Sequence, residues 1–297
     1  MHDADVIIVG AGPAGITAAM QLRRYGLRIL MFEQDMVGGL LWHANLVENY
    51  PGFYGIGAEL AGRMAAQLER YEVPVLQERV ERVEYSQGMF DLSTADTQIS
   101  CPFLLLASGT QPKRLQGLTE TGNTESRIFY DARPLMGQKN KTFAIIGAGD
   151  GAFDYALNLC EHNQVVILNR SKKCRCLPLL RNRAEACGVD IWLEAQVTAV
   201  QVIEDKVVLY CLQREQEQTL TVDALLVAVG REPRLDYLSA AMRLGMAKLQ
   251  DARRLFLAGD VHNGIHRQAA IAAGDGLLAA MNIWEEYERY ADSGKKR

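Results

Sequence analysis

The sequence predicts an α/β protein with two Rossmann-like dinucleotide-binding domains, the second inserted into the first in a three-layer ββα arrangement. Two observations carry this prediction. A strand, a glycine-rich turn and a helix follow one another twice, around 5–25 and 142–160, and a later apolar strand ends in Gly259-Asp260. That late strand is expected to complete the first domain. The expected bounds are 1–113 with 236–297 for the first dinucleotide-binding domain and 114–235 for the second, inserted one.

The first glycine-rich turn follows a short apolar strand. Residues 5–9 end in Val-Ile-Ile-Val, which favours a buried strand, and residues 16–25 continue as a helix. The first Gly permits a tight turn, the second lets the backbone approach a pyrophosphate, and the third lets the helix pack closely on the strand. Free N–H groups at the helix N-terminus attract phosphate. The residues expected to hold FAD here are Gly10, Gly12, Pro13, Ala14 and Gly15.

An acidic residue ends the next strand. Residues 28–32 are mostly apolar, and Glu33 follows them. This position lies roughly 20 residues beyond the first glycine, where a carboxylate accepts hydrogen bonds from ribose hydroxyls. Strand, turn, helix, strand and acid therefore stand in the order that a dinucleotide site requires, and we expect Glu33 and Gln34 to contact FAD.

The same order returns in the middle of the chain. A strand at 142–146, a glycine-rich turn at 147–152 and a helix to about residue 160 follow one another. Ala replaces the third Gly of the turn, a variant that Rossmann motifs accept. The next strand ends in Asn169, which occupies the place that Glu33 has in the first copy.

Basic residues follow this second strand. Arg170 cannot accept from a ribose hydroxyl but can bind the 2′-phosphate of NADP(H), and Lys172, Lys173 and Arg175 add to the positive charge. The pattern favours NADPH over NADH, and a solvated basic turn is the other interpretation. The residues expected to hold NADPH are Gly147, Gly149, Asp150, Gly151, Asn169, Arg170, Arg175 and Gly230.

Two further apolar strands run into a Gly that is followed by Pro three residues later. They lie at 103–109 and 224–230. Each is expected to return the chain to its own sheet, and the segments 111–118 and 230–235 are expected to be the paired hinges between the domains. The strand before Gly259 and the helix after it then complete the first domain.

Composition excludes several classes of function. The 297 residues carry a net charge of -4, without the basic excess that nucleic acid or an anionic membrane surface attracts. The N-terminal apolar run is too short for a signal peptide or a membrane span. Six cysteines without dense spacing are typical of a reducing, cytoplasmic setting, and no spacing of His and Cys indicates a metal site. The basic tail at 293–297 is expected to be a solvated terminus.

The chain resembles the low-molecular-weight thioredoxin reductase family of flavoproteins over nearly its whole length. Besides the glycine motifs, the resemblance rests on Gly38-Gly39-Leu40, Val47-Glu-Asn-Tyr-Pro-Gly52, Ala107-Ser-Gly-Thr110, Gly259-Asp260 and Arg267-Gln-Ala269. It implies that the cofactors are FAD and NADPH and that the protein is a homodimer. The further FAD contacts that it implies are Gly39, Leu40, Asn49, Val80, Ser108, Gly109, Gly259, Asp260, Arg267, Gln268 and Ala269.

The chain departs from this family at one place. A thioredoxin reductase carries a Cys-x-x-Cys pair shortly before the second glycine motif, where this chain has Asp131 and Pro134. The glutathione reductase type places its cysteines after the first helix, but no cysteine lies between Gly38 and Asn45. The stretch 147–159 is similar to ferredoxin/flavodoxin–NADP reductases, which share the two-domain plan without the cysteine pair. This resemblance implies a small redox protein as the electron acceptor.

Two other interpretations stay open. Cys174 and Cys176 are the one close cysteine pair, and basic neighbours are expected to lower their thiol pKa. They can serve a divergent thioredoxin or disulfide reductase, or be incidental in a surface turn.

Cys160 and Cys187 are expected to be small buried residues on helices. The third interpretation of the whole chain is a non-catalytic flavin-binding redox sensor.

His266 is the candidate catalytic residue. It directly precedes Arg267 and can supply a proton near the flavin ring, although a histidine there can equally be a packing neighbour. Trp42 and His43 follow Gly39 and stand where they can border the flavin. Hydride transfer needs little acid–base chemistry, because the protein mainly positions the nicotinamide against the flavin.

Overall fold

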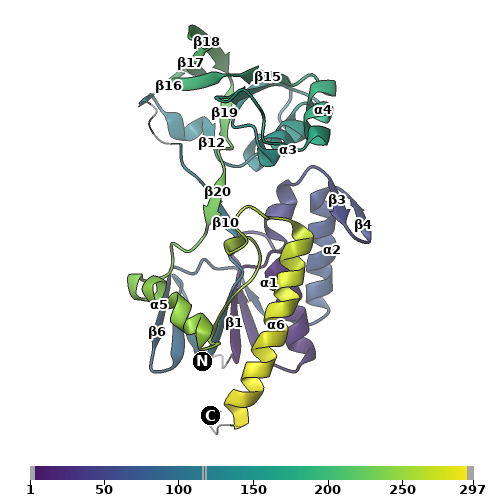
Figure 1. Cartoon of the computed structure of the whole chain (residues 1–297), viewed down its shortest axis with the longest axis vertical. Coiled ribbons are helices and arrows are strands. Elements are labelled where there is room, and N and C mark those ends of the chain that lie inside the picture. Colours follow the sequence, from purple (N-terminus) through teal and green to yellow (C-terminus); the bar gives the residue numbers. More distant parts are fainter. Residues whose placement is uncertain (1–3, 116, 118, 293–297) are drawn as a thin grey trace. The chain divides into compact units, whose positions relative to one another are not determined.

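The computed structural model describes residues 4–115, 117 and 119–292, and it divides into two compact units (Figure 1). Unit 1 comprises the described residues of 1–42, 47–111 and 233–297, and unit 2 those of 43–46 and 112–232. Unit 2 is thus inserted into unit 1, as the sequence predicts. The expected bounds after 113 and before 236 lie two and three residues from these, and the sequence does not predict that 43–46 belongs to unit 2.

Two expectations fall outside the described residues, the first wholly and the second in part. They are the tail at 293–297 and, within the expected hinge 111–118, residues 116 and 118. Two short strands carry the chain from unit 1 to unit 2 and back, and they pair with each other. These strands are β10 (Thr110–Pro112) and β20 (Arg231–Pro233).

Unit 1 contains a five-stranded parallel sheet. Its strands are β1 (Val6–Val9), β2 (Ile29–Phe32), β5 (Val75–Leu76), β9 (Phe103–Leu106) and β21 (Leu255–Leu257). The order across the sheet is β21-β9-β1-β2-β5. β1, β2 and β9 are buried along their whole length, which explains why each is a continuous apolar run in the sequence. Because β21 pairs with β9, the C-terminal part of the chain completes the first sheet.

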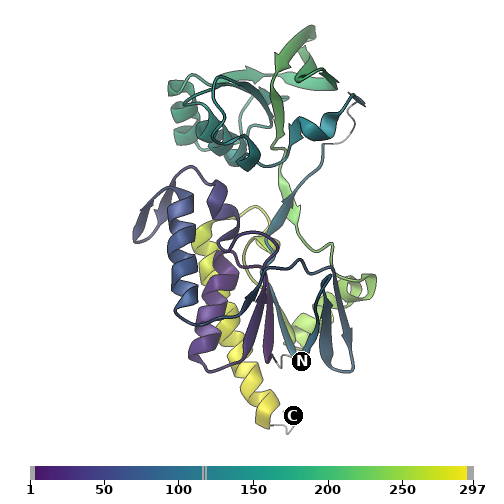
Figure 2. The ribbon, with the colours of Figure 1, turned by 180° about the vertical axis from the view of Figure 1, so that it is seen from behind.

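A further layer lies on each face of this sheet (Figure 2). One face carries the helices α1 (Pro13–Arg24), α2 (Gly57–Glu69) and α6 (Ala269–Asp292). The other carries α5 (Ala240–Asp251) and an antiparallel sheet of β6 (Arg82–Ser86), β7 (Met89–Ser93) and β8 (Gln98–Cys101). Ile7 and Leu104 of the parallel sheet and Phe90 of the antiparallel sheet belong to one buried core. This is the predicted three-layer ββα arrangement.

Unit 2 repeats the same plan. Its parallel sheet comprises β12 (Ile128–Phe129), β13 (Thr142–Ile146), β14 (Gln164–Asn169), β15 (Asp190–Leu193) and β19 (Ala224–Val227), in the order β12-β19-β13-β14-β15. The helices α3 (Asp150–Leu159) and α4 (Pro178–Ala186) share one core with this sheet. A second core joins the sheet to the strands β11 (Thr119–Thr121), β16 (Ala195–Ile203), β17 (Lys206–Gln213) and β18 (Gln216–Val222).

Short elements complete the fold. They are the hairpin of β3 (Val47–Tyr50) and β4 (Phe53–Gly55) and the 3₁₀ turns at Gly39–His43, Thr124–Ser126, Arg133–Leu135 and Gly259–Val261. Among the helices of the described residues, none combines the length and the apolar character needed to cross a membrane.

Candidate functional site

The first glycine-rich turn joins β1 to α1 in a geometry that requires glycine at two positions. Gly10 has a φ of 104°, and a Cβ there would lie 2.3 Å from the carbonyl oxygen of Ala107. A Cβ on Gly15 would lie 2.0 Å from the carbonyl oxygen of Gly10. Gly12 differs, because no described atom lies within 4 Å of the position that its Cβ would take. The turn therefore leaves open space at the N-terminus of α1.

This open space fits a pyrophosphate group. Gly12 is the N-cap of α1, and no side chain in the described part of the chain caps the helix there. The first N–H groups of the helix therefore remain for a ligand, and the helix dipole adds partial positive charge. A neighbouring loop packs on the turn, since the Gly38 N–H donates to the Ala11 carbonyl oxygen at 2.7 Å. A Cβ on Gly39 would lie 3.2 Å from Gly12 Cα.

Glu33 lies buried beside this turn, at the end of β2. Its Oε2 accepts a hydrogen bond from the Ala11 N–H at 2.7 Å, and its Oε1 accepts one from the Asp35 N–H at 2.9 Å. The two donors hold the carboxylate in one orientation, and each oxygen keeps a lone pair for a ribose hydroxyl. Gln34 and Leu40, which are also expected to contact FAD, are exposed.

The C-terminal part of unit 1 returns to the same turn. Gly259 has a φ of 78°, and a Cβ there would lie 2.9 Å from Ala14 Cβ. Gly259 therefore lies against the first turn of α1, and Asp260 is the next residue in the sequence. Elsewhere in unit 1, Asn49 Nδ2 donates to Gln268 Oε1 at 2.9 Å, which joins two of the expected FAD residues.

Three expected residues of unit 1 have other surroundings. The Ser108 hydroxyl donates to the Arg234 carbonyl oxygen at 2.7 Å and accepts from Tyr237 at 2.8 Å, so it supports the unit's own structure. The Val80 side chain is buried in the core, which leaves its main chain for a cofactor contact. His266, the candidate catalytic residue, is exposed.

The second glycine-rich turn has the same geometry in unit 2. Gly147 has a φ of 118°, and a Cβ there would lie 2.3 Å from the carbonyl oxygen of Ala228. Gly149 is the N-cap of α3, and the one described atom near its Cβ position is the Arg175 carbonyl oxygen, at 4.0 Å. No described atom lies within 4 Å of the corresponding position on Gly151. α3 thus offers a second open N-terminus for phosphate.

The basic loop after β14 is fastened to this turn. The Arg175 N–H donates to the Ala148 carbonyl oxygen at 2.8 Å, and Asp150 Oδ1 accepts from the Leu177 N–H at 2.8 Å. The side chains of Arg170 and Arg175 are exposed. Guanidinium groups in a loop tied to an open helix N-terminus suit the 2′-phosphate of NADPH.

Asn169 shapes this loop. Its Nδ2 donates to the carbonyl oxygens of Ser171 and Lys173, both at 3.0 Å, and its Oδ1 accepts from the Ser171 N–H at 3.2 Å. Unlike Glu33, whose oxygens accept from the neighbourhood of the glycine-rich turn, Asn169 uses its amide to hold the loop that carries the basic residues.

The expectation of a lowered thiol pKa at Cys174 and Cys176 is wrong. Both side chains pack against the core shared by α3 and α4. Burial raises the pKa of each thiol above its ordinary value and outweighs the nearby charge of Arg181. A raised pKa lowers the thiolate fraction at neutral pH and with it the reactivity of the pair.

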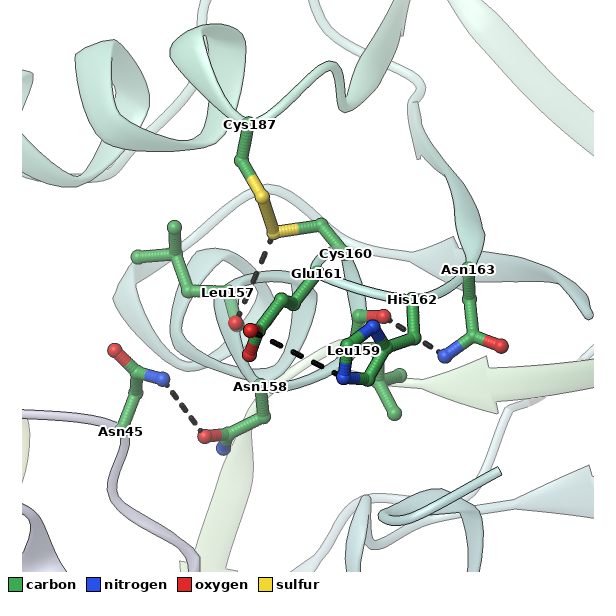
Figure 3. Close-up of a disulfide and its surroundings, with 9 residues drawn as sticks. All are labelled: Asn45, Leu157, Asn158, Leu159, Cys160, Glu161, His162, Asn163 and Cys187. Carbon is green, nitrogen blue, oxygen red and sulfur yellow. Dashed lines mark hydrogen bonds and ion pairs between the residues drawn. A yellow bond between two sulfur atoms is a disulfide. The ribbon is translucent and has the colours of Figure 1, made fainter. Parts of the chain in front are cut away.

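Cys160 and Cys187 form a disulfide between the C-terminal ends of α3 and α4 (Figure 3). Their Cα atoms lie 6.1 Å apart. This corrects the expectation of two small buried residues, because Cys160 is buried whereas Cys187 is exposed. The two cysteines are 27 positions apart, and the helix ends that carry them meet only after the chain has passed through β14.

Asp131, which stands where the resemblance places the first cysteine, belongs to a polar network in unit 2. Its Oδ2 lies 3.1 Å from His43 Nδ1, and the His43 side chain is 9% exposed. Asn158 Nδ2 donates to the His43 carbonyl oxygen at 2.8 Å. Both carboxylate oxygens of Asp154 accept from the Asn45 N–H at 3.2 Å, and burial raises the pKa of Asp154 to about 6.

Sequence reasoning missed this network. One signal was available, since Asp154 and Asn158 are polar residues four positions apart and therefore share a face of α3. Their partners His43 and Asn45 come from a segment far away in the sequence, so the spacing alone could not identify them. The position of His43 after Gly39 allows it to border the flavin. In the structure His43 contacts Asp131 and Asn158.

Comparison with known proteins gives a consistent family. The family described as "Pyridine nucleotide-disulphide oxidoreductase" matches residues 4–276. The mitochondrial thioredoxin reductase 1 of Arabidopsis thaliana is 31% identical over 95% of this chain and 83% of that protein, and the thioredoxin reductase of Chlamydia pneumoniae is 30% identical over 93% and 96%. The solved structure of T. acidophilum thioredoxin reductase matches with a TM-score of 0.82 at 26% identity, over 96% of this chain and 99% of that one.

Proposed function

Since the chain belongs to the pyridine nucleotide-disulphide oxidoreductase family and is an FAD-containing NADPH oxidoreductase of the thioredoxin reductase type, we propose that it delivers electrons to an acceptor other than a disulfide of its own. One observation carries the proposal. Asp131 and Pro134 stand where the resemblance places the cysteine pair, and no two cysteines of the chain are separated by two residues. The proposed acceptor is a small redox protein of the ferredoxin or flavodoxin class. Bound FAD supplies the chemistry, because it takes up hydride and releases electrons singly or in pairs.

The two open helix N-termini are the proposed cofactor sites. FAD is held at α1, with Glu33 on the ribose and the segments 259–260 and 267–269 on the rest of the cofactor. NADPH is held at α3, with Arg170 and Arg175 on the 2′-phosphate. The support is that both turns leave the same open space at the second glycine and that a carboxylate or a basic loop lies next to each.

Anaerobic stopped-flow mixing tests the NADPH site. The purified protein, with FAD bound, is mixed separately with NADPH and NADH while the flavin absorbance is followed. Fast bleaching with NADPH and slower bleaching with NADH is the expected result. If neither nucleotide bleaches the flavin, unit 2 does not deliver hydride and the redox-sensor interpretation replaces this one.

A direct assay tests the acceptor. The NADPH-reduced protein is offered a [2Fe–2S] ferredoxin, a flavodoxin or an oxidised thioredoxin, each under anaerobic conditions. Reduction of the ferredoxin or the flavodoxin is expected, with little reduction of the thioredoxin. Turnover with thioredoxin alone would contradict the proposal.

A second candidate is a disulfide reductase that acts on thioredoxin. The curated relatives favour it, because they are named thioredoxin reductases. Cys174 and Cys176 would then supply the thiols, although burial raises the pKa of both. Changing both residues to Ser distinguishes the candidates: this one requires that thioredoxin-linked turnover disappears while FAD stays bound, and unchanged turnover excludes the pair.

The assembly that we propose is a homodimer. The resemblance to dimeric flavoproteins supports it, and so does the apolar face that α6 exposes at Ile271, Leu278 and Met281, which are 40%, 60% and 45% exposed. Light scattering after gel filtration is expected to give twice the chain mass of 33.0 kDa. A single-chain mass at micromolar concentration would contradict the dimer.

A further inference from the structure

The disulfide encloses the basic loop of unit 2. Cys160 is the C-cap of α3 and Cys187 the C-cap of α4, and 27 positions separate them. Everything between them, β14 with the loop that follows and α4 itself, lies within the covalent ring. The basic residues inside this ring are Arg170, Lys172, Lys173, Arg175, Arg181 and Arg183.

α4 contributes few side chains to the core that it shares with α3. The helix has nine residues, all of them described, and Ala184 is the only one that is fully buried. Leu179 within the helix and Leu177 just before it are 48% and 56% exposed. A helix this short is marginal on its own, so its position depends on the packing of Ala184 and Leu180 in the core and on the covalent link. The disulfide supplies this link by joining its C-terminal end to α3.

The N-terminal end of α4 leads directly into the nucleotide-binding turn. Leu177, the N-cap of α4, donates its N–H to Asp150 in the first turn of α3. Arg175, two residues earlier, donates its N–H to Ala148 within the glycine-rich turn. The loop with the basic residues is therefore held at one end by the turn and at the other by a helix that the disulfide anchors.

We propose that Cys160–Cys187 is a thiol–disulfide exchange site for an external dithiol, and that opening it weakens the binding of NADP(H) to unit 2. This inference rests on the proposed NADPH site, which it extends with a control by thiol redox state. The substrate class is a dithiol, either a small molecule or a reduced redox protein.

The difference in exposure between the two cysteines, of which Cys160 is buried and Cys187 exposed, defines the exchange. A thiolate of the dithiol attacks the sulfur of the exposed Cys187, the bond to Cys160 breaks, and Cys160 takes up a proton from water. The second thiol of the reductant then attacks the reductant's first sulfur, which is bonded to Cys187 in the mixed disulfide. This closes the cyclic disulfide and releases Cys187, which takes up a proton to become a thiol. In balance, the protein disulfide gains two electrons and two protons, and the dithiol becomes a cyclic disulfide.

The other cysteines of the same core do not compete for the bond. Cys174 and Cys176 pack in the same core as Cys160, so an internal exchange is sterically conceivable. Burial raises the pKa of both thiols, which keeps them protonated and poorly nucleophilic at neutral pH. The raised pKa of both thiols thus favours attack by an external dithiol over internal exchange.

Cysteine mapping is the first part of the test. The protein is denatured with N-ethylmaleimide, digested and analysed by mass spectrometry, with and without prior treatment with dithiothreitol. The peptides that contain Cys160 and Cys187 are expected to be labelled only after dithiothreitol. Labelling of both cysteines without dithiothreitol would overturn the inference.

Calorimetric titration with NADP⁺ is the second part. The FAD-loaded protein is titrated in its oxidised and its dithiothreitol-treated form, and NADP⁺ is used because it binds without reducing the flavin. If the opened loop adopts its closed arrangement between about a tenth and a third of the time, the dissociation constant rises about three- to tenfold. Equal dissociation constants overturn the inference but leave the NADPH site intact. Absence of binding to either form overturns both.

Two variants complete the test. Cys160→Ser with Cys187→Ser is expected to bind NADP⁺ as weakly as the reduced protein and to ignore dithiothreitol. Cys211→Ser, which removes a buried free cysteine of β17 in the same unit, is the matched control and is expected to keep the full response. A loss of the response in the Cys211 variant would contradict the assignment, and the wild-type titration decides the matter even if the double variant does not fold.

Discussion

Arg170 is the residue on which the preference for NADPH over NADH rests. Its exposed side chain belongs to the loop that is hydrogen-bonded to the second glycine-rich turn. A charge-assisted hydrogen bond to a phosphate contributes about 1.5–3 kcal/mol. Arg170→Ala is therefore expected to raise the KM for NADPH roughly 10- to 100-fold and to leave that for NADH within about twofold. Steady-state kinetics with ferricyanide as acceptor measure both values.

The matched control is Lys139→Ala, which removes an exposed cation that lies outside this loop. It is expected to change neither KM. An equal rise for both nucleotides in the Arg170 variant would show that the side chain does not read the 2′-phosphate.

Asp154 makes the stability of unit 2 depend on pH. Its ordinary pKa is 3.8, and burial raises the pKa to about 6. Between these values the native protein keeps a proton that the unfolded chain has released, so stability falls as the pH rises from about 4 to about 6. The fall amounts to about 2–3 kcal/mol. Asp154→Asn, which keeps an oxygen for the Asn45 N–H, is expected to remove it.

Urea unfolding at pH 4.5 and pH 7.5 measures this effect. The variant is expected to gain more stability relative to the wild type at pH 7.5 than at pH 4.5. Asp205→Asn, at a side chain that is 89% exposed, serves as the control and leaves the pH dependence unchanged. Parallel pH profiles for the wild type and the Asp154 variant would contradict the assignment.

For single residues, the sequence predicts the required backbone conformation better than it predicts the pKa of a side chain. A positive φ at Gly10 and at Gly147 follows from the motif itself, because the tight turn after a strand is a local requirement. The thiol pKa of Cys174 depends on how deeply tertiary packing buries it, and the charges that neighbour it in the sequence do not reveal this.

Among the elements, α1 and α6 approach closely at Gly276. A Cβ on Gly276 would lie 2.0 Å from the carbonyl oxygen of Ala14, so Gly276→Ala must move α6 away from α1. We expect a loss of about 1–3 kcal/mol in the free energy of unfolding. We also expect a lower FAD content, because Ala14 lies in the first turn of α1. Urea unfolding and the ratio of flavin to protein absorbance measure the two effects.

Gly274 provides the matched control on the same helix. No described atom lies within 4 Å of the position that its Cβ would take. Gly274→Ala is expected to be neutral or to stabilise by up to about 1 kcal/mol, because Ala is the better helix former. Equal effects at both positions would mean that the contact with Ala14 is not the cause.

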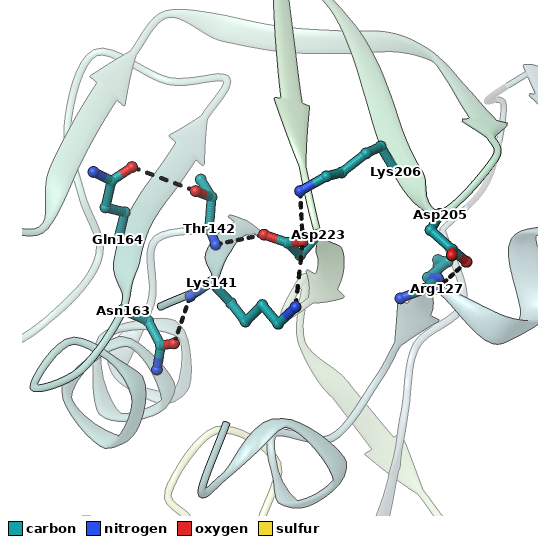
Figure 4. Close-up of polar contacts among 8 residues, drawn as sticks. All are labelled: Arg127, Lys141, Thr142, Asn163, Gln164, Asp205, Lys206 and Asp223. Carbon is teal, nitrogen blue, oxygen red and sulfur yellow. Dashed lines mark hydrogen bonds and ion pairs between the residues drawn. The ribbon is translucent and has the colours of Figure 1, made fainter. Parts of the chain in front are cut away.

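Asp223 connects the starts of β13 and β19 (Figure 4). Its Oδ2 accepts from the Thr142 N–H at 2.8 Å, and its Oδ1 lies 2.6 Å from Lys206 Nζ. Burial alone would raise the pKa of Asp223, but the hydrogen bonds from Lys206 and the Thr142 N–H hold the pKa below its ordinary value. The charged carboxylate thus stabilises the fold at neutral pH, and this contribution disappears as the pH falls through the lowered pKa.

Asp223→Ala is accordingly expected to cost about 1–3 kcal/mol at pH 7 and less near pH 3. Asp205→Ala, at the exposed partner of Arg127, is the control and stays within about 0.5 kcal/mol. Chemical denaturation at both pH values measures the free energy of unfolding of each variant and of the wild type. A cost that is unchanged near pH 3 would attribute the effect to packing instead of charge.

The sequence predicts the fully buried strands of the parallel sheets well, but it predicts the half-buried strands that pack on them less well. The strands β1, β2 and β13 are short apolar runs and need no further context. In β16 and β17 the buried positions are interleaved with more exposed ones. The reason is that only one face of these strands packs on the parallel sheet. The disulfide was also beyond prediction, since it depends on where two helices end in space.

In the whole molecule, the recurrence of one motif and the late apolar strand before Gly259 together make the insertion predictable. Gly10 stands to Ala107 in unit 1 as Gly147 stands to Ala228 in unit 2, with the same 2.3 Å approach. Each turn therefore needs its own sheet, and because β21 follows the second sheet in the sequence but pairs with β9 of the first, the second sheet interrupts the first. The membership of 43–46 in unit 2 has no such signature, because this segment contacts Asp154 and Asn158, which are far from it in the sequence.

Each unit also has a hydrophobic core of its own, which predicts separate responses to the two cofactors. The core around Ile7 and Phe90 lies in unit 1, and those around Phe143 and Val207 lie in unit 2. A ligand present at 100 times its dissociation constant stabilises the unit that binds it by about 2.7 kcal/mol. For units of this size such a gain raises the melting temperature on the order of 10 °C.

Scanning calorimetry of the protein after removal of FAD measures these responses. Two transitions are expected, of which FAD raises one and NADP⁺ the other. Arg170→Ala should weaken the response to NADP⁺ and leave that to FAD unchanged, because Arg170 lies in unit 2. If FAD and NADP⁺ raise one common transition by the same amount, the two units unfold together and their separate cores do not make them independent in stability.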